Sequence, residues 1–545
     1  MTEMISKGNI GDMLFNLRRR GIRLWVQEGR LCYQAPKGVV TEEEMKKLRT
    51  RSAEIIAFFS NTTAIRSTPQ QALGPRDRNE LVPLTYSQLS HWHVYQLDRR
   101  PSKRSIYFAI RVSGRLDVEI LEKSLTGIIA RHESLRTRIV STNGTPIQVV
   151  DSIRDCRLTP INMSQGSRAE CESYARQLVS DFINQPIDIA SNSLCAWQLI
   201  HLAEYNYILV IAMDHLIADG ASVGVLLREL FRSYAELAQR RKFSPPEITQ
   251  FPDYAVWQRK ALSSWARDRI SYWHQHLARA KNTPLFTAEA KVASMGQVRV
   301  PVHFDAALLR NLRELSRRSR TTLAMGVLSV YFASLFHWKK HSDWVISFTN
   351  IGRFEPGLES AVGFFSSRLF LRVIMSPDVS FMELLQQVSS EYGNAIKNDD
   401  FGKMVVDLPW DSTLRNVSFN WFPSQFQLSL SPDNSLSENL LSELSNGDIE
   451  MTVYKVDPTT IVQTDVGLYA TGRELGVAFS ETPDGLVGVF GSNSRDVNPA
   501  AVEKFKHAFV QIARRLCDEP NNPLATFRRK NDLAEIDLRG DLRTS

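Results

Sequence analysis

The stretch that decides the fold is Tyr207-Ile-Leu-Val-Ile-Ala-Met-Asp-His-Leu-Ile-Ala-Asp-Gly-Ala-Ser222. Its first seven residues form an apolar run that is typical of a buried strand. After it, apolar residues recur at helical spacing, and Ser222 is expected to cap this helix because its hydroxyl can accept a first-turn amide hydrogen. His215 is therefore expected in a short loop between a strand and a helix, where rigid elements often hold a catalytic side chain.

His215 and Asp219 are the candidate functional side chains of this loop. Histidine can accept and return a proton near neutral pH. Asp219 could fix the loop by pairing with an arginine, and Gly220 is suited to a turn. A lone His-x-x-x-Asp also fits a histidine satisfied at a strand end beside an ordinary turn aspartate. The order strand, loop, glycine and amphipathic helix favours the functional interpretation.

The segment Asp214-His-Leu-Ile-Ala-Asp-Gly220 resembles the HHxxxDG motif of condensation domains from non-ribosomal peptide synthetases. Those domains have the chloramphenicol-acetyltransferase-like fold, and the second histidine of their motif is catalytic. The resemblance therefore implies that His215 is the catalytic residue and that Asp219 and Gly220 complete the motif. Asp214 departs from the pattern, because it stands where the family has its first histidine.

Further segments resemble the same family in the same order. Gln88 and Trp92 match the opening SxAQxRxW motif, and Arg131-His-Glu-Ser-Leu-Arg-Thr137 matches RHExLRT. Arg131 and Arg136 are both candidates for the partner of Asp219, and the sequence leaves the choice between them open. Asn420 matches an asparagine of a late strand that faces the active site in the family.

The resemblance implies an α+β or α/β fold with two lobes in a V shape. The amino-terminal lobe is expected over residues 81–265, the carboxy-terminal lobe over 266–540 and a polar tail over 541–545. A tunnel between the lobes would receive an acyl thioester on the phosphopantetheine of a carrier protein from one face, and a nucleophile from the other. No bound cofactor and no metal are expected.

Residues 1–60 form a separate αββα pattern: a helix within 10–20, a hairpin around Glu28-Gly29 and a helix that begins near Thr41. This pattern resembles the β-hairpin docking domains of synthetase subunits, which capture a short, often acidic tail of an upstream carrier protein. Eleven Lys and Arg against seven Asp and Glu suit such a tail. The alternative is a small cap on the main domain, and residues 61–80 resemble a linker. The candidate docking residues are Arg20, Arg23, Trp25, Arg30, Tyr33 and Lys37.

Composition narrows the cellular setting. The net charge of +7 is mild for 545 residues and does not indicate nucleic-acid binding. Five scattered cysteines without C-x-x-C spacing favour neither a disulfide framework nor a zinc site and fit a reducing compartment. We see no signal peptide and no apolar run near the ~20 residues that span a bilayer, so a cytoplasmic location without membrane contact is expected.

The resemblance thus implies an acyltransferase that moves an acyl, polyketidyl or peptidyl chain from a carrier protein to an amine or hydroxyl. The acceptor is expected on a second carrier protein or as a free small molecule, in chain elongation or release by a stand-alone subunit. Asp214, Asp219 and Ser222 also fit the DxxxxDxxS pattern of heterocyclisation domains, although those lack the catalytic histidine. Further alternatives are an epimerisation domain, an acyl-CoA transferase of the same fold and an inactive carrier-binding module.

Overall fold

The computed structural model divides the chain into two compact units, Met1–Gln71 and Ala72–Ser545. The structure describes residues 23–27, 30–34, 40–52, 73–98, 102–103, 106–163, 166–190, 193–286, 298–353, 355, 357–399, 412–422, 449–454, 474–482, 485–492 and 497–528.

The first unit contains the hairpin that the sequence predicts. Strands β1 (Arg23–Gln27) and β2 (Arg30–Gln34) pair antiparallel, with Gln27 opposite Arg30. Helix α2 (Glu42–Thr50) follows, and Thr41 and Glu44 cap its start reciprocally: each side chain accepts a hydrogen bond from the backbone amide of the other. The predicted hairpin and second helix are confirmed, and the helix predicted within 10–20 lies outside the described residues.

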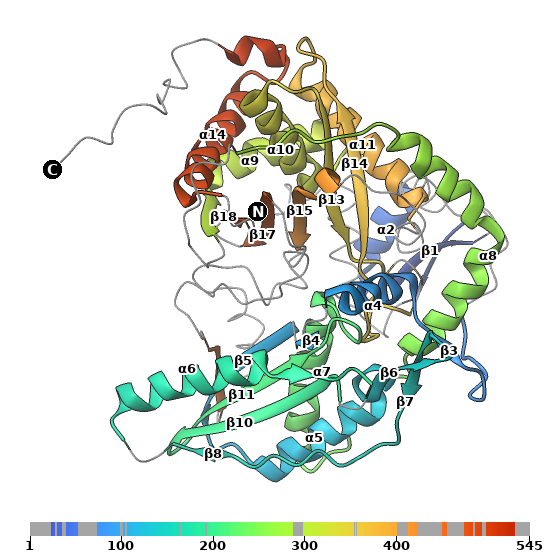
Figure 1. Cartoon of the computed structure of the whole chain (residues 1–545), viewed down its shortest axis with the longest axis vertical. Coiled ribbons are helices and arrows are strands. Elements are labelled where there is room, and N and C mark those ends of the chain that lie inside the picture. Colours follow the sequence, from blue (N-terminus) through green and yellow to red (C-terminus); the bar gives the residue numbers. More distant parts are fainter. Residues whose placement is uncertain are drawn as a thin grey trace. The chain divides into compact units, whose positions relative to one another are not determined.

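The second unit contains two mixed sheets. The first has the strand order β16 (Ile449–Val453), β5 (Ile106–Gly114), β11 (Asn206–Met213), β10 (Cys195–Ala203) and β8 (Ile161–Asn162). The second has the order β12 (Val298–Phe304), β18 (Gly485–Ser492), β17 (Leu475–Thr482), β15 (Val417–Phe422), β13 (Asp343–Asn350) and β14 (Ser367–Ile374). In Figure 1 the first sheet lies in the lower part of this unit and the second in the upper part. Strand β16 belongs to the first sheet although it comes late in the chain.

Helices cover these sheets, and short elements complete the unit. The helices are α4 (Tyr86–Asp98), α5 (Val118–Arg131), α6 (Arg168–Asn184), α7 (Gly220–Ala238), α8 (Phe251–His276), α9 (Ala306–Arg318), α10 (Leu323–Lys339), α11 (Phe381–Lys397) and α14 (Pro499–Asp518). The small sheets are β3 (Val82–Pro83) with β7 (Thr145–Val150) and β6 (Thr137–Thr142), and β4 (Ser102–Lys103) with β9 (Pro186–Ile187). Single 3₁₀ turns lie at Glu133–Arg136, Ser412–Arg415 and Leu524–Arg528.

The strand that precedes His215 is apolar throughout because both of its faces are covered. Leu209 and Ile211 of β11 pack into a core with α5 and α7. Ile208 and Val210 point the other way and join a smaller core that includes α6. A strand buried on both faces has a continuous hydrophobic run instead of an alternating one. The predicted hairpin of β10 and β11, which leads to His215, is confirmed.

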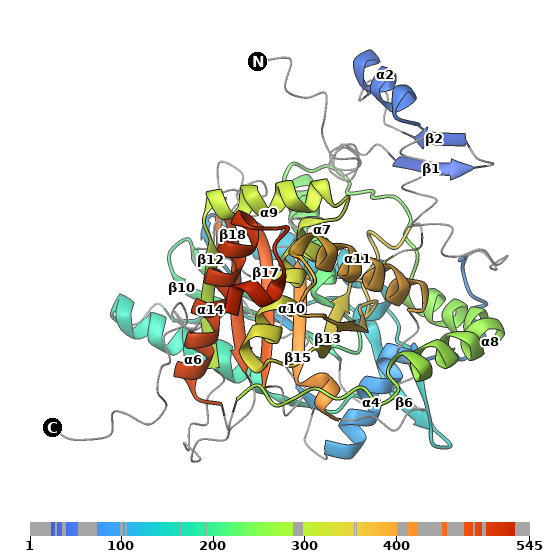
Figure 2. The ribbon, with the colours of Figure 1, turned by 90° about the horizontal axis from the view of Figure 1, so that it is seen from above.

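The second core surrounds α10, which the sequence predicts to be a core helix. Residues 325–336 of this helix are all buried. Figure 2 shows α9, α10, α11 and α14 together against the six-stranded sheet. Among the described residues, no single helix is both long and apolar enough to cross a membrane. Helices α9 and α10 meet that test only as a pair, and the pair is bent by 103°.

Candidate active site

The loop of residues 214–219 is buried and is held by its own backbone and by α4. The Asp214 amide donates to the Leu194 carbonyl at 2.8 Å, and the Ile217 amide donates to the Asp214 carbonyl at 3.2 Å. The side-chain amide of Gln88 donates to the Leu216 carbonyl at 2.7 Å. His215 is the second residue after the end of β11 and is 6% exposed. Gln88, which matches the family's opening motif, therefore supports the loop that carries His215.

Asp214 is fully buried, and its carboxylate is used inside the loop. It accepts a hydrogen bond from the Leu216 amide at 2.8 Å and one from the Tyr95 hydroxyl at 3.0 Å. An aspartate that bonds to the amide two residues ahead stabilises a tight turn. The residue in place of the first motif histidine thus shapes the loop and joins it to α4.

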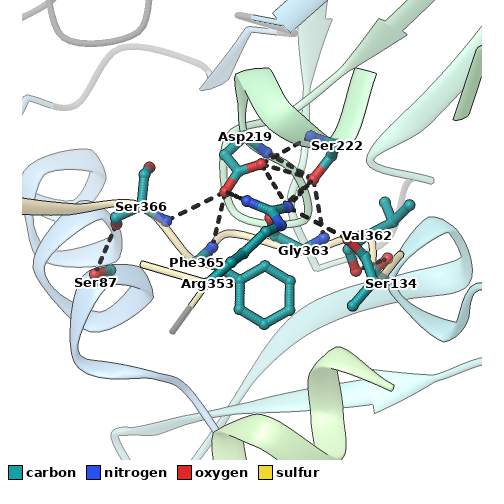
Figure 3. Close-up of polar contacts among 10 residues, drawn as sticks. Ser87, Ser134, Asp219, Ser222, Arg353, Val362, Gly363, Phe365 and Ser366 are labelled. Carbon is teal, nitrogen blue, oxygen red and sulfur yellow. Dashed lines mark hydrogen bonds and ion pairs between the residues drawn. The ribbon is translucent and has the colours of Figure 1, made fainter. Parts of the chain in front are cut away.

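Asp219 forms a bidentate ion pair with Arg353, a residue that follows β13. The two N···O distances are 2.7 and 2.8 Å, and both side chains are almost completely buried (Figure 3). Asp219 also accepts hydrogen bonds from the amides of Phe365 and Ser366 at 3.1 and 3.2 Å. Burial alone would raise the pKa of Asp219, but the Arg353 charge and the hydrogen bonds from Arg353 and Ser222 outweigh it and lower that pKa.

The prediction that Arg131 or Arg136 pairs with Asp219 is wrong. Arg131 binds the Glu229 carboxylate of α7 at 3.0 Å. Arg136 donates to the Asp151 carbonyl. Both arginines therefore bind other residues, and the guanidinium that binds Asp219 is that of Arg353.

The prediction that Ser222 is the N-cap of α7 is also wrong. Helix α7 begins at Gly220, and Asp219 is its N-cap because its carboxylate accepts the Ser222 amide hydrogen at 2.9 Å. The Ser222 hydroxyl donates to Asp219 and also contacts the backbone of Gly363. Ser222 therefore links the first turn of α7 to a segment from the other half of the chain.

Residues 361–366, which we call the bridging segment, connect the two halves of the unit beside His215. The Ser134 hydroxyl donates to the Val362 carbonyl at 2.8 Å, and the Ser87 hydroxyl donates to the Ser366 carbonyl at 3.2 Å (Figure 3). Gly352 allows Arg353 to approach this segment. Its φ is +72°, and a Cβ there would lie 1.9 Å from the Phe365 carbonyl oxygen.

His215 is surrounded by rings and by one more cation. Its ring centroid lies 4.3 Å from that of Phe364 and 5.3 Å from that of His91. Burial lowers the pKa of His215, and the positive charge of Arg368 adds to this. The Asp219 carboxylate and the backbone carbonyls of His215 and Ala218 oppose the lowering without reversing it. Among the described residues, the Nδ1 atom of His215 has no hydrogen-bond partner. The imidazole is therefore neutral near pH 7.

The remaining predicted site residues belong to other elements or are described only in part. Asn420 is buried in β15 of the six-stranded sheet. In the first unit, Tyr33 is 47% exposed in β2. The strands place the backbones of Arg23, Trp25 and Arg30 in the hairpin, while Arg20 and Lys37 lie outside the described residues. Within the described ranges, no group of three or more His, Cys, Asp or Glu side chains is arranged to hold a metal ion.

Sequence patterns alone do not identify Arg353, His91 and Tyr95 as residues of this site. Arg353 follows Gly352 at the end of a strand, and no local spacing relates it to Asp219. His91 and Tyr95 are four residues apart in α4 and so share one face of that helix. That spacing is the one available signal for these two residues. Their position next to the loop follows only from the packing.

Two mixed sheets, with a buried histidine on the loop between a strand and a helix, place the chain in the chloramphenicol-acetyltransferase-like fold class. The condensation-domain family model matches residues 78–471. The chain therefore belongs to the condensation-domain family of non-ribosomal peptide synthetases, whose members are acyltransferases that form amide or ester bonds. The TubC N-terminal docking-domain model matches residues 10–61.

Curated relatives of the chain are large synthetases. The chain is 27% identical to part of the linear gramicidin synthase of Brevibacillus parabrevis, over 83% of this chain and 9% of that protein. It is 25% identical to the beauvericin nonribosomal cyclodepsipeptide synthetase BEA1 of Gibberella fujikuroi over 95% of this chain and 15% of that protein. The chain thus spans less than a tenth of the gramicidin synthase proteins that it matches.

Solved structures agree on the fold. The X-domain from teicoplanin biosynthesis superposes with a TM-score of 0.69 at 22% identity, over 84% of this chain and 99% of that one. The first condensation domain of the calcium-dependent antibiotic synthetase, in complex with a substrate analogue, gives 0.63 at 16% identity over 82% and 99%. The mixed α/β fold predicted from the sequence is confirmed. A docking domain followed by a condensation domain implies carrier-protein partners, and condensation domains act on phosphopantetheine-carried substrates.

Proposed function

We propose that this chain transfers an acyl, polyketidyl or peptidyl group from a carrier-protein thioester to an amine or hydroxyl, with His215 as the catalytic base. The observation that carries this proposal is the neutral imidazole of His215 on a loop fixed by the Asp219–Arg353 ion pair. A base of this kind is effective when it is neutral and firmly positioned.

The reaction requires the transfer of one proton from the nucleophile to the leaving group. The nucleophile attacks the thioester carbonyl carbon, a new C–N or C–O bond forms, and the C–S bond breaks. His215 takes the proton from the nucleophile and returns it to the departing sulfur, so the products are an amide or ester and the free phosphopantetheine thiol. Orientation of two large substrates supplies a further part of the rate.

The contacts of Asp214 favour condensation over heterocyclisation. A carboxylate that acts as a cyclisation catalyst must reach the substrate, whereas that of Asp214 is fully buried and bonded to Leu216 and Tyr95. Asp219 is equally buried and bound to Arg353. His215 is thus the acid–base group of this loop that best suits contact with substrate.

The first unit supports recruitment of the donor by its hairpin. In the described part of this unit, strands β1 and β2 form a sheet of two strands, so the outer backbone groups of either strand can pair with an extended peptide. Tyr33 offers an exposed aromatic ring on β2. We therefore expect the acidic tail of an upstream carrier protein to add to this hairpin, with basic residues steering its approach.

The test is intact-protein mass spectrometry of a carrier protein that bears its tail and an acyl-phosphopantetheine group. Wild-type protein is mixed with candidate amines and alcohols, beside the variants His215→Ala and His303→Ala. His303 is an exposed histidine of β12 and serves as the matched control.

The proposal predicts that the carrier loses its acyl group only when a nucleophile is present. This loss should persist in His303→Ala and disappear in His215→Ala. A product that is lighter by a further water would support heterocyclisation instead. Equal rates in wild type and His215→Ala would refute the role of His215.

A further inference from the structure

A second imidazole lies beside His215 and has no counterpart in the catalytic motif. The ring centroids of His91 and His215 are 5.3 Å apart. Phe364 contacts both rings, at 5.6 Å from His91 and 4.3 Å from His215. Among the described residues, His91 makes ring contacts and no hydrogen bond, so its polar ring atoms are available to a ligand.

Helix α4 fixes the position of His91 from both sides. One turn before it, the Ser87 hydroxyl donates to the Ser366 carbonyl of the bridging segment. One turn after it, Tyr95 donates to Asp214 and packs its ring edge-on against His91 at 5.2 Å. The helix that carries His91 is therefore bound to the two segments that flank His215.

Both imidazoles are neutral near pH 7. Burial lowers the pKa of His91 to about 3, and His215 and Arg368 contribute to this shift. Burial and Arg368 also lower the pKa of His215. A neutral imidazole has one donor and one acceptor nitrogen, so the pair offers two acceptors within one small space. The charge of Arg368 also disfavours an ammonium ion here, and the acceptor substrate would bind as a free amine.

We propose that His91 is a specificity-determining residue that accepts a second hydrogen bond from the nucleophile and thereby selects an amine over an alcohol. The inference rests on the proposed function and names the acceptor class of that same site. A primary amine has two N–H groups: His215 removes the proton of one, and His91 accepts a hydrogen bond from the other. An alcohol has a single O–H group and can engage only one of the two imidazoles.

The separation of the two rings is compatible with one ligand atom that is bound by both imidazoles. Hydrogen bonds of this kind measure about 3 Å between heavy atoms. Imidazole nitrogens accept in the ring plane, so with ring centroids 5.3 Å apart a ligand nitrogen in front of the ring edges can lie within that reach of one nitrogen of each ring. A site built to bind a second N–H discriminates strongly against a substrate that lacks it, because a polar group is then left without its partner.

The experiment compares matched nucleophiles in single-turnover reactions. The donor is a carrier protein that bears its tail and a hexanoyl-phosphopantetheine group. The acceptors are alaninamide against lactamide and phenethylamine against phenethyl alcohol. Wild type is measured beside His91→Phe, which keeps an aromatic ring without the acceptor, and His91→Gln, which keeps an acceptor. His93→Phe on another face of α4 is the matched control.

We expect wild type to favour the amine of each pair. His91→Phe should slow the amine reaction roughly tenfold and change the alcohol reaction by less than about twofold, as the loss of one hydrogen bond predicts. His91→Gln should recover part of the loss, and His93→Phe should resemble wild type. Thermal unfolding of each variant separates these effects from misfolding.

Two results overturn the inference while the proposed function stands. One is an equal loss for amines and alcohols in His91→Phe, which would make His91 a packing residue. The other is a wild type that favours alcohols. Failure of wild type to unload the carrier with either member of any pair overturns the proposed function itself, and the inference with it.

Discussion

Arg353 holds the loop of His215 through its contacts with Asp219. Its guanidinium binds Asp219 through two hydrogen bonds, touches the Ser222 hydroxyl at 3.0 Å and lies over the Phe365 ring. Such a pair is stabilising only while both charges are present, because removal of one leaves the other buried without compensation.

We expect Arg353→Ala to lower the free energy of unfolding by about 3–5 kcal/mol, as loss of one partner of a buried pair does. Arg353→Lys should recover only part of this, because lysine cannot reproduce the two parallel hydrogen bonds. Urea denaturation measures both values. The control is Arg317→Ala, which breaks an exposed pair with Glu314 and should cost at most about 1 kcal/mol. Equal costs for Arg353→Ala and Arg317→Ala would contradict the structural role of Arg353.

The pH dependence of the reaction follows from the lowered pKa of His215. A general base works in its neutral form, and burial together with Arg368 lowers the pKa of this imidazole. The single-turnover rate should therefore stay constant as the pH falls to about 6.5, the ordinary histidine value, and decline only below it. Arg368→Met removes a positive charge that disfavours protonation and should move this acid limb to higher pH. A wild-type limb at or above about 6.5 would contradict the assignment.

At the scale of single elements, the sequence correctly predicts the strands and helices that have a clear local hydrophobic pattern. The apolar run of β11, its hairpin with β10 and the buried helix α10 all follow from neighbouring residues. The start of α7 does not, because Asp219 and Ser222 are both good caps and only the geometry shows which carboxylate or hydroxyl reaches which amide.

The bridging segment and the strand end before it depend on glycine at two places. Beyond the close approach at Gly352, a Cβ at Gly363 would lie 2.2 Å from the Phe251 ring. These contacts place Arg353 and the amides that bind Asp219. A side chain at Gly352 requires the Phe365 backbone to shift, and one at Gly363 requires the Phe251 ring to shift.

We expect Gly352→Ala to destabilise the protein by about 1–3 kcal/mol, since alanine is strained at positive φ and its Cβ would meet a backbone oxygen. Acyl transfer should fall with it. The control is Gly127→Ala in α5, where a Cβ meets nothing within 4 Å. That substitution should be neutral or stabilise by up to about 1 kcal/mol. Chemical denaturation of both variants is the measurement, and an unaffected Gly352→Ala would show that Arg353 does not need this backbone conformation.

At the scale of the whole molecule, the features that the sequence does not predict are contacts between segments that are far apart along the chain. Motif order identifies the fold and His215, because both depend on segments that can be recognised one by one. The partner of Asp219 and the second imidazole come from segments far from the motif along the chain. Periodicity carries no information about such pairs, so the motif arginines Arg131 and Arg136 are favoured from sequence and only the packing identifies Arg353.

The division into two units leads to a prediction about recruitment. Removal of residues 1–71 should leave the second unit folded, since the two units are separately compact. The rate with a tail-bearing carrier protein at low concentration should fall roughly tenfold or more, because the donor is no longer tethered. The rate with a small soluble acyl thioester should not change. A carrier-dependent rate that is insensitive to the deletion would exclude docking through the first unit.

Strand β16 has a consequence for how the chain is made. It forms the edge of the first sheet beside β5, yet it is synthesised several hundred residues later. During translation the edge of β5 therefore stays unpaired until most of the chain has left the ribosome, and an open edge strand invites pairing with other chains. An amino-terminal fragment that ends near residue 265 would keep that edge open permanently. Expression of such a fragment is therefore expected to give aggregates, and splitting the protein between its two sheets would not yield two independent folding modules.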